Sequence, residues 1–428
     1  MAVGKVVVIG AGVIGVTTAH ALLEEGYQVT LLEAAPEAAQ GTSRANGGFL
    51  SAGFCAPWAM PGLPRQLLAA LFSPQAPVRW RPDFSLHQMR WVRSLWAHCT
   101  AARFADHRKR LVRLALLSHK RLRQLVAHVG LPFDFQSAGV LLLMRRRPSD
   151  SAIQKRLQDW HALGIDACWC EPDQLRALEP GLSASLELAG GFYVQGDGSG
   201  DCERFTQGLL DWSLKRGLQF EPAARVDALE LDKSGRRLHA VRSGSRRWDA
   251  QAFVMAAGVE SVNLLRGVLD LPVLPVKGYS VTLELNTAAG AQRAVIDESS
   301  KLAVARLGQR IRLAGMAELV GHDLRVDRTR CQQLIDQYQA LYGPVPPQEP
   351  RLWAGLRPMT ADGTPLIGAT PIEGLYLNTG HGTYGWTLAC GSAQLLADAL
   401  ARRPSALDLH DYALEPSARN SRSRVGAL

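Results

Sequence analysis

The order of hydrophobic and polar positions at the start of the chain predicts a strand, a turn, a helix and a second strand. Lys5–Ile9 is a β-branched run without a polar interruption, which is typical of a parallel strand buried on both faces. A glycine-rich turn follows, and Val16–Glu25 has the residues of a helix that ends at Gly26. Gln28–Leu32 is the second strand, so the chain opens like a parallel α/β sheet.

Farther along, helical segments alternate with short strands. Leu86–Val129 predicts a long basic helical region, and Tyr279–Leu285 alternates like an antiparallel strand. Leu307–Arg310 has the residues of a hairpin turn. The remaining predicted elements are helices at Cys202–Arg216 and Trp386–Leu400 and strands at Gly139–Met144, Leu218–Glu221, Arg225–Leu231, Ala252–Ala257, Leu302–Arg306, Ile311–Leu313 and Leu375–Asn378.

This order of elements predicts an α/β fold in which an antiparallel-sheet substrate domain is inserted into a discontinuous nucleotide-binding domain. We expect the nucleotide-binding domain to comprise residues 1–85, 196–272 and 351–428. Residues 86–195, which are largely helical, and 273–350 form the substrate domain. The polar, basic tail from Ser417 is expected to be loose.

Composition is compatible with a large folded protein and indicates one without a disulfide framework or a membrane span. The chain has 428 residues, of which 47% are hydrophobic and 20% charged, so it can bury a large core. Seven cysteines without a C-x-x-C pair indicate reduced thiols in a cytosol-facing protein. We find neither a signal peptide nor an apolar run long enough to span a bilayer.

The glycine-rich turn has the spacing of a dinucleotide-binding site. In Gly10-Ala11-Gly12-Val13-Ile14-Gly15, the first glycine permits a tight turn and the second lets backbone N–H groups approach a pyrophosphate. The third glycine allows helix and strand to pack closely. Glu33 ends the second strand, where an acid accepts hydrogen bonds from ribose hydroxyls. The acid disfavours NADP, but the Rossmann-like motif alone does not separate NAD from FAD.

Two further segments favour FAD. Small residues and hydroxyls in Thr42-Ser43-Arg44-Ala45-Asn46-Gly47-Gly48 suit a loop against phosphates and a flavin ring, although an ordinary turn-rich loop has the same composition. Gly380-His381-Gly382-Thr383-Tyr384-Gly385 lies between a strand and a helix whose N-terminus can stabilise negative charge on a reduced flavin. We also expect cofactor contacts from Val226, Ala257 and Gly258, in or just after two predicted strands.

Short stretches spread over nearly the whole chain carry a family resemblance. They are Val7–Gly15, Thr42-Ser43 with Ala45-Asn46, Ala56–Ala59 with Pro61-Gly62, Gly200–Cys202, Pro275–Ser280, Gly315–Glu318, Trp353–Thr360 with Asp362–Pro365, and Leu377–Thr383 with Gly385–Thr387. With them the sequence resembles the small subunit of bacterial D-amino acid dehydrogenases, in the group that includes glycine oxidase and sarcosine oxidase. The resemblance implies FAD held without a covalent link. Arg44, Phe54-Cys55 and Tyr384 depart from the family pattern near the expected pocket.

The resemblance points to Arg357 as the residue that anchors a substrate carboxylate. A guanidinium group binds a carboxylate through two parallel hydrogen bonds. The Gly-Leu-Arg-Pro setting places Arg357 at the end of a strand, with Pro358 stiffening the exit. The alternative is a structural arginine paired with a nearby acid such as Asp362.

Other candidates have weaker support from the sequence. Tyr279 could add a hydroxyl or a wall to the substrate pocket, or lie in the core, and Lys277 could line the site or cap a strand. His381 could act at the flavin or be a packed loop histidine. Packing is the default role of the remaining candidates, which are Met316, Glu318 and Trp353.

The family implies oxidative deamination of D-amino acids to 2-oxo acids and ammonia, with hydride transfer from Cα to N5 of FAD. A quinone-type acceptor would then take the electrons. Alternatives are a dehydrogenase of D-hydroxyproline or another secondary amine, an oxidase that uses O2, and an NAD-dependent dehydrogenase. We expect no metal, because the histidines lack ligand spacing. Nucleic-acid binding is suggested by the charge of +9 alone, without a matching motif, and is not expected.

The positive charge is concentrated in one stretch, Arg65–Arg123, which has 13 Lys or Arg residues and two acids. Aromatic and aliphatic residues lie in or near it: Trp58, Trp80, Trp91, Trp96, Leu67-Leu68, Leu71-Phe72 and Leu95. This combination suits the headgroup boundary of an anionic membrane, where a quinone would be accessible. We therefore expect peripheral attachment to the cytoplasmic face of the inner membrane. The alternative is a solvated basic helix whose tryptophans face the core.

Overall fold

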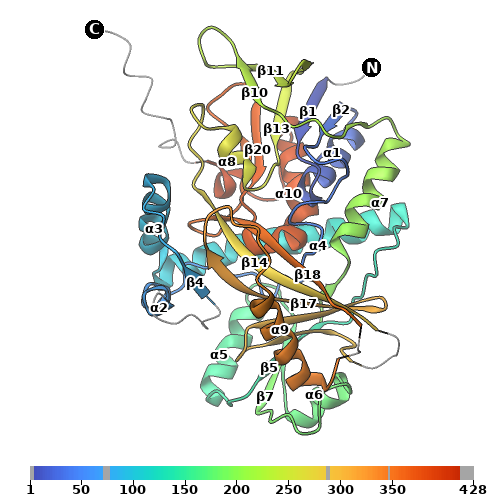
Figure 1. Ribbon diagram of the computed structural model, residues 1–428, viewed down its shortest axis with the longest axis vertical. Coiled ribbons are helices and arrows are strands. Elements are labelled where there is room, and N and C mark those ends of the chain that lie inside the picture. The colour runs from blue at the N-terminus through green and yellow to red at the C-terminus, as the bar shows by residue number, and fades with distance from the viewer. Residues whose placement is uncertain (1–3, 71–77, 286–289, 346–347, 415–428) are drawn as a thin grey trace.

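Two large sheets, one above the other in Figure 1, organise the molecule. The computed structural model describes residues 4–70, 78–285, 290–345 and 348–414. Two expectations concern residues outside these ranges. They are the membrane contact of Leu71-Phe72 and the loose basic tail from Ser417.

The upper sheet has six strands, and only its edge strand β19 runs antiparallel to its neighbour. Val6 of β1 pairs with Val29 on one side and with Ala252 on the other, so β1 is central. The strands are, in spatial order, β19 (Leu366–Ala369), β20 (Leu375–Thr379), β13 (Ala252–Met255), β1 (Lys5–Ile9), β2 (Gln28–Leu32) and β9 (Gln219–Glu221).

Both faces of this sheet are covered, which explains the unbroken apolar run in β1. Val6 and Val8 pack into a core with three helices, α1 (Val13–Glu24), α7 (Cys202–Leu214) and α10 (Gly385–Leu400). Val7 and Ile9 pack on the opposite face. The elements on that face are a small antiparallel sheet of β10 (Ala228–Leu231), β11 (Leu238–Ser243) and β12 (Arg246–Asp249), and helix α8 (Glu260–Leu264).

The lower sheet has nine strands, most of them antiparallel. Helix α9 (Arg328–Tyr342) covers one face, where its Cys331 and Leu334 pack against the strands. The strands are, in spatial order, β18 (Arg351–Thr360), β14 (Val273–Glu284), β17 (Arg310–Leu319), β16 (Leu302–Leu307), β15 (Ala294–Asp297), β5 (Val140–Met144), β7 (Gly190–Val194) and β6 (Ala167–Cys170), with β4 (Val78–Trp80) beside β17.

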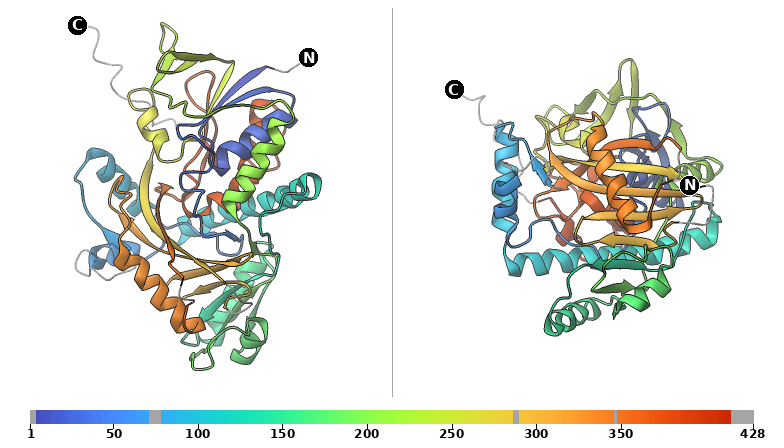
Figure 2. Two further views of the ribbon diagram at one scale, coloured as in Figure 1. Left: turned by 45° about the vertical axis from the view of Figure 1, so that its right-hand side comes forward. Right: turned by 60° about the horizontal axis from the view of Figure 1, so that its bottom comes forward.

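The basic region between the sheets contains two helices, not one continuous helical segment. α3 (Leu86–His98) ends before Thr100, whose side chain accepts a hydrogen bond from Arg103 and caps α4 (Ala101–Val129). α4 crosses the molecule and contacts α10, while α3 stands at one edge (Figures 1 and 2). The other short elements are α2 (Leu63–Ala70), α5 (Asp150–His161), α6 (Pro172–Leu178), β3 (Phe49–Leu50), β8 (Gly198–Ser199) and the 3-10 turns Gly382–Tyr384 and Leu409–Tyr412.

Two strands belong to the lower sheet although their segments were expected in the nucleotide-binding domain. β4, within 1–85, pairs with β17, and β18, within 351–428, pairs with β14. Of the remaining strands, β1, β2, β9, β13, β19 and β20 lie in the upper sheet, and β5, β6, β7 and β14–β17 lie in the lower. The mixed α/β fold predicted from the sequence is confirmed.

Candidate active site

The glycine-rich turn joins β1 to α1 at the carboxyl edge of the upper sheet. Gly10 has φ +103°, which favours glycine. A Cβ atom on Gly15 would lie 1.7 Å from the carbonyl oxygen of Gly10, so only glycine lets α1 start this close to the turn. α1 begins at Val13-Ile14, and no side chain of its N-cap residue Gly12 occupies the helix end. Such an end attracts a phosphate.

Glu33 lies beside this turn. Its carboxylate accepts hydrogen bonds from the N–H of Ala11 at 2.6 Å and of Ala35 at 2.9 Å. These bonds hold the side chain next to the first helical turn. A carboxylate has about four lone-pair positions, so Glu33 can accept further hydrogen bonds from ribose hydroxyls in this orientation.

The loop Thr42–Gly48 lies between the turn and the lower sheet. The Ser43 hydroxyl accepts a hydrogen bond from the N–H of Val13 at 3.0 Å, and the Thr42 hydroxyl donates to the carbonyl of Leu356 on β18 at 2.7 Å. The start of the loop therefore bridges the two sheets beside the helix end at which a pyrophosphate is expected.

The glycines at the end of the loop are required by packing as well. A Cβ atom on Gly47 would lie 3.2 Å from the Cβ of Ala314, and Gly48 has φ +82°. The Asn46 side chain accepts a hydrogen bond from the N–H of Gly48. The backbone carbonyl of Asn46 accepts one from the Arg312 guanidinium of β17 at 2.7 Å. One face of β17 and β18 is thus pressed against the loop expected to contact the cofactor.

Val226, Ala257 and Gly258 lie at the same edge of the upper sheet. Val226 is buried in the core that also contains Ile9, and the N–H of Ala224 donates to the carbonyl of Glu33, which brings this segment beside β2. Gly258 follows β13 with φ +58°, and its carbonyl accepts from Thr379 of β20. In parallel α/β sheets, ligands bind at this carboxyl edge.

The segment Gly380–Thr383 connects β20 to α10. Gly380 and Gly382 have φ values of +79° and +55°, and the Thr383 hydroxyl lies 4.0 Å from the sulfur of Met359. His381 is only 2% exposed, and burial lowers the pKa of its imidazole to about 3, so it is neutral. Its Nε2 atom has no hydrogen-bond partner among the described residues.

These features fit the flavin expected from the sequence. The buried Nε2 of His381 is costly without a partner, so it is suited to contact a bound polar group. The N-terminus of α10 begins at Gly385 without a side-chain cap in the described chain, which leaves its N–H groups available to a negatively charged ring edge.

Arg357 lies on β18, on the sheet face that meets Thr42–Gly48. Its guanidinium packs over Gly278 of β14, where a Cβ atom would lie 2.4 Å from Nη2. Nη1 donates to the carbonyl of Met316 at 2.9 Å, and Met316 has φ +60°. Burial lowers the pKa of Arg357 to about 10, so it remains a cation at neutral pH.

No ion pair of Arg357 occurs among the described residues. Asp362, the acid considered as its structural partner, instead lies 3.9 Å from Nδ1 of His107. Arg357 is partly buried, and a cation removed from water without an acid beside it carries a desolvation cost, which a substrate carboxylate would reduce.

Arg357 also differs from expectation in its place on the strand. It is an interior residue of β18, and Pro358 continues the strand rather than ending it. β18 is an edge strand, where a missing N–H is tolerated. Pro358 pairs with Pro275 of β14. The pairing of β17 with β14 reaches only to Lys277, so at Pro275 β14 is paired with β18 alone.

Tyr279 lies on the opposite face of the sheet from Arg357, so the structure does not bring these two predicted site residues together. Successive residues of a strand point to opposite faces, and Gly278 faces the guanidinium. The Tyr279 hydroxyl donates to Glu318 at 3.0 Å, and Lys277 shares this face. The expectation that Tyr279 or Lys277 lines the pocket around Arg357 is therefore not met, because both side chains lie on the other face of the sheet.

The departures noted in the sequence include Tyr384 and Cys55. The Tyr384 hydroxyl donates to the carbonyl of Ala56 at 2.9 Å. Burial raises the pKa of both Tyr384 and the Cys55 thiol, so both are neutral.

The sequence analysis did not identify Gly278 as a residue of the site. A glycine inside an alternating strand can signal the close approach of another group.

Comparison with known proteins identifies the family of the chain. The profile of the family described as FAD dependent oxidoreductase matches residues 5–399. A D-amino acid dehydrogenase of Neisseria meningitidis is 38% identical over 424 residues, covering 96% of this chain and 99% of the relative. A protein of the same name from Cereibacter sphaeroides is 40% identical over 415 residues, covering 96% and 95%. The resemblance read from the sequence and the FAD expectation are confirmed.

Solved structures share the fold at lower identity. Glycine oxidase from Geobacillus kaustophilus has a TM-score of 0.76 and 23% identity, covering 96% of this chain and 98% of its own. L-proline dehydrogenase from P. horikoshii has a TM-score of 0.75 and 16% identity, covering 96% of each chain. These neighbours show the arrangement of the two sheets and no more.

Proposed function

The chain belongs to the FAD dependent oxidoreductase family, and on that premise we propose that it oxidises D-amino acids at the α-carbon to 2-oxo acids and ammonia. One observation carries the proposal: the partly buried guanidinium of Arg357 has no acidic partner among the described residues and lies on the sheet face that meets the Thr42–Gly48 loop. The D configuration rests on the names of the relatives at 38% and 40% identity.

The residues of this chain bind and orient the substrate. Arg357 takes the carboxylate through two hydrogen bonds, and the Met316 carbonyl fixes the guanidinium for that contact. His381 is neutral and offers one nitrogen to a polar group near the start of α10. When bound, FAD supplies the redox chemistry by accepting a hydride from the substrate. Gly12, Ser43 and Glu33 would hold its pyrophosphate and ribose.

Anaerobic reduction of the protein-bound flavin tests this function. D-Alanine and other D-amino acids should bleach the visible flavin absorbance, whereas the L-enantiomers should leave it unchanged. Faster bleaching by D-hydroxyproline than by primary amines would favour the secondary-amine alternative. Bleaching by L-amino acids alone, or none with any amine, would contradict the proposal.

We further propose a quinone-type electron acceptor and peripheral attachment to an anionic membrane through α3. Within the described ranges, every helix is too short or too polar to cross a bilayer. Several of the apolar residues expected at a membrane are instead core residues: Trp91 and Leu95 are 2% and 1% exposed, and Leu67 is also buried.

A different set of side chains is exposed. The outer face of α3, defined as Leu86, Met89, Arg90, Arg93 and Trp96, follows helical spacing. Leu86 is 72% exposed and Trp96 is 42% exposed, and Phe84 lies just before the helix. Exposed apolar side chains between arginines suit the headgroup region of an anionic leaflet.

Co-sedimentation with phosphatidylglycerol vesicles tests this surface. The protein should pellet at low salt, and Leu86→Ser with Trp96→Ser should release it. Leu214→Ser is the control, because Leu214 is exposed on α7. Retention of the double variant, or a wild-type protein that stays in the supernatant at low salt, would exclude α3 as the membrane contact.

The acceptor is tested separately, by mixing the reduced protein with a soluble ubiquinone analogue and with O2. Faster reoxidation by the quinone than by O2 would support a dehydrogenase. The reverse order would assign the protein as an oxidase.

A further inference from the structure

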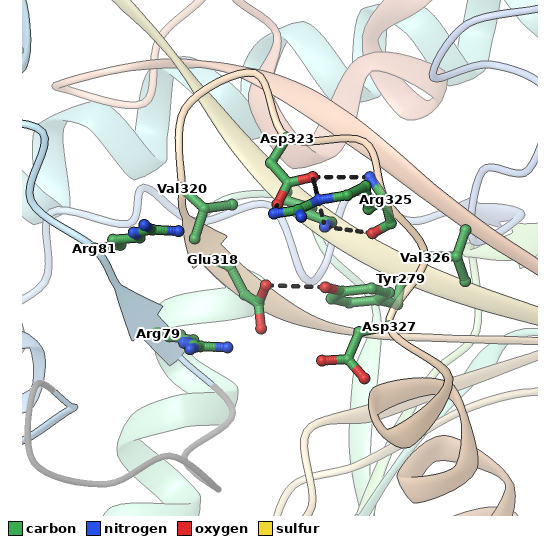
Figure 3. A pocket seen from close by; sticks show the side chains of 10 residues that line it. Arg79, Arg81, Tyr279, Glu318, Val320, Asp323, Arg325, Val326 and Asp327 are labelled. Atoms are coloured by element: carbon green, nitrogen blue, oxygen red, sulfur yellow. Dashed lines mark hydrogen bonds and ion pairs between the residues drawn. The ribbon is translucent and has the colours of Figure 1, made fainter.

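A second cavity of about 270 Å³ lies on the opposite face of the lower sheet from Arg357. β4 forms one wall, the ends of β14 and β17 form the floor, and the segment before α9 forms the other wall (Figure 3). Tyr279 and Glu318 lie in the floor, and Val320 and Val326 give the cavity two apolar side chains. Nothing described above for the oxidation reaction uses these residues.

Two of the three acids of this cavity already have cationic partners. Glu318 is 3% exposed and accepts from the Tyr279 hydroxyl and from Arg330, each at 3.0 Å. Asp323 binds Arg325 through both oxygens, and these bonds hold its pKa below the usual range. Buried Lys277 lies 3.8 Å from Asp323 and donates to the carbonyl of Arg325.

The third acid, Asp327, is used differently. Its Oδ1 atom caps α9 by accepting from the N–H groups of Thr329 and Arg330. Figure 3 shows this carboxylate directed toward the cavity from the α9 side. One carboxylate oxygen therefore stabilises the helix, and the acid still presents negative charge to the cavity.

Arg79 and Arg81 supply positive charge on the other wall. Arg79 lies in β4, and Arg81 directly follows the strand, where its N–H still donates to the carbonyl of Leu319. Figure 3 shows both side chains directed toward the cavity. Among the described residues, neither guanidinium has an ion pair or a side-chain hydrogen bond. Arg79 pairs in register with Glu318, whose oxygens are already occupied.

From these opposed charges we infer that the cavity binds a small zwitterionic α-amino acid, at a site separate from the substrate site. The ligand carboxylate lies between Arg79 and Arg81, its ammonium group faces Asp327, and a short apolar side chain contacts Val320 and Val326. A dianion such as phosphate would be repelled by Asp327, and a free amine would leave the two guanidinium groups unmatched.

Calorimetric titration of the FAD-loaded protein with 2-aminoisobutyrate tests this inference. This amino acid has no α-hydrogen, so it cannot be oxidised, and binding is measured independently of the proposed D-amino acid oxidation. In an Arg357→Met background, which cripples the substrate site, we expect one binding site per chain. Adding Arg79→Met and Arg81→Met should weaken that binding at least tenfold.

Matched variants separate the cavity from general charge effects. Arg113→Met with Arg236→Met removes two other exposed arginines and should leave binding unchanged. Asp327→Asn keeps a helix-capping side chain but removes the charge, so it should weaken 2-aminoisobutyrate and leave acetate unaffected. Flavin absorbance equal to that of the parent shows that each variant is folded.

Three results would overturn the inference. They are no binding in the Arg357→Met background, unchanged binding after loss of Arg79 and Arg81, and acetate or phosphate binding as tight as that of 2-aminoisobutyrate. The last result would leave a simple anion site.

Discussion

At the scale of single residues, Arg357 combines a stability cost with a binding role. Its charge is partly buried on a sheet face, and the Met316 carbonyl is its only hydrogen-bond partner among the described residues. Since a buried, unpaired cation destabilises the folded state, binding of a carboxylate is favoured by the relief of that cost. The geometry of the guanidinium, and not its charge alone, decides how well the carboxylate is held.

Arg357→Lys tests this distinction. Lysine keeps the positive charge but cannot form two parallel hydrogen bonds, so kcat/KM for D-alanine should fall at least tenfold, or about 1.4 kcal/mol. The measurement is the rate of anaerobic flavin reduction against substrate concentration. Flavin content should stay at the wild-type level, and kinetics equal to wild type would remove Arg357 from the substrate site.

Gly278→Ala tests how the guanidinium is positioned. The new methyl group would lie 2.4 Å from Nη2 of Arg357 and must displace it. We expect a higher KM and a lower kcat/KM, with FAD retained. Gly196→Ala is the control, because a Cβ atom there meets nothing within 4 Å. Equal kinetics of the two variants would show that Gly278 does not set the position of Arg357.

The sequence predicted the identity of Arg357 better than its surroundings. The Gly-Leu-Arg-Pro stretch is local and belongs to the motifs that carry the family resemblance, so its arginine could be chosen from the chain alone. Alternation along Tyr279–Leu285 predicts that neighbouring side chains face opposite ways, but not which face meets the cofactor. For that reason Tyr279 was placed with Arg357, although Gly278 is the residue beneath the guanidinium.

At the scale of elements, the turn from β1 to α1 depends on a contact between backbone atoms. A Cβ atom on Gly15 would overlap the Gly10 carbonyl oxygen at 1.7 Å, and neither group is the end of a flexible side chain. Gly15→Ala should therefore push α1 away from β1 and yield protein with little or no FAD. Gly41→Ala serves as the control, because open space surrounds that position.

The flavin-to-protein absorbance ratio after purification measures this effect. Full flavin occupancy in Gly15→Ala would show that the turn tolerates a side chain and would contradict the assignment. The motif was predictable because its spacing is encoded within six consecutive residues, Gly10–Gly15, and needs no distant partner.

The division of the basic region into two helices was not predicted. Charged and apolar residues occur on both sides of Cys99–Thr100, so the pattern shows no break there. A single threonine, Thr100, caps the N-terminus of α4. The consequence is large for the surface, because α3 can take a direction different from that of α4. Its inward side carries Trp91 and Leu95, and a separate stripe faces outward.

At the scale of the whole molecule, buried carboxyl groups should make stability depend on pH. Glu179 is fully buried at the end of α6, where it accepts hydrogen bonds from the N–H groups of Gln292 and Arg293. Burial raises its pKa to about 7, and burial raises the pKa of Asp197 to about 6. Both folded-state values exceed those of an unfolded chain, so the folded protein binds more protons.

The resulting stability is present at low pH and is lost as pH rises through about 6 to 7. The free energy of unfolding should fall between pH 5 and pH 8, with a slope from Glu179 of up to about 1.4 kcal/mol per pH unit. Glu179→Gln should be less stable overall, because its amide accepts fewer hydrogen bonds, but its stability should change less with pH. Urea unfolding followed by tryptophan fluorescence measures both; parallel pH curves would contradict the raised pKa.

The two sheets show why the sequence did not predict the sheet to which every strand belongs. Parallel strands with helices between them have strong patterns, whereas β4 and β18 join the lower sheet through pairings with β17 and β14 that no local signal encodes. β14 carries a proline and a glycine, at Pro275 and Gly278, which hide its first half from a search for alternation. Helix α9 was missed as well, although Asp327 is a recognisable N-cap residue.

The pairing of the upper sheet also sets the order of events during protein synthesis. Val6 pairs with Ala252, and Phe253 pairs with Leu375, so the ribosome makes β1 and its neighbour β2 long before the other neighbour, β13, and then β20 exist. Until β20 and α10 emerge, the nascent chain exposes one side of β13 and lacks the Gly380–Thr383 segment. Such distant pairings slow folding and leave apolar strands open to aggregation. With the proposed cofactor contact at Gly380–Thr383, we expect FAD to bind only after almost the entire message is translated. A chain terminated before Gly380 should then bind chaperones and lack flavin.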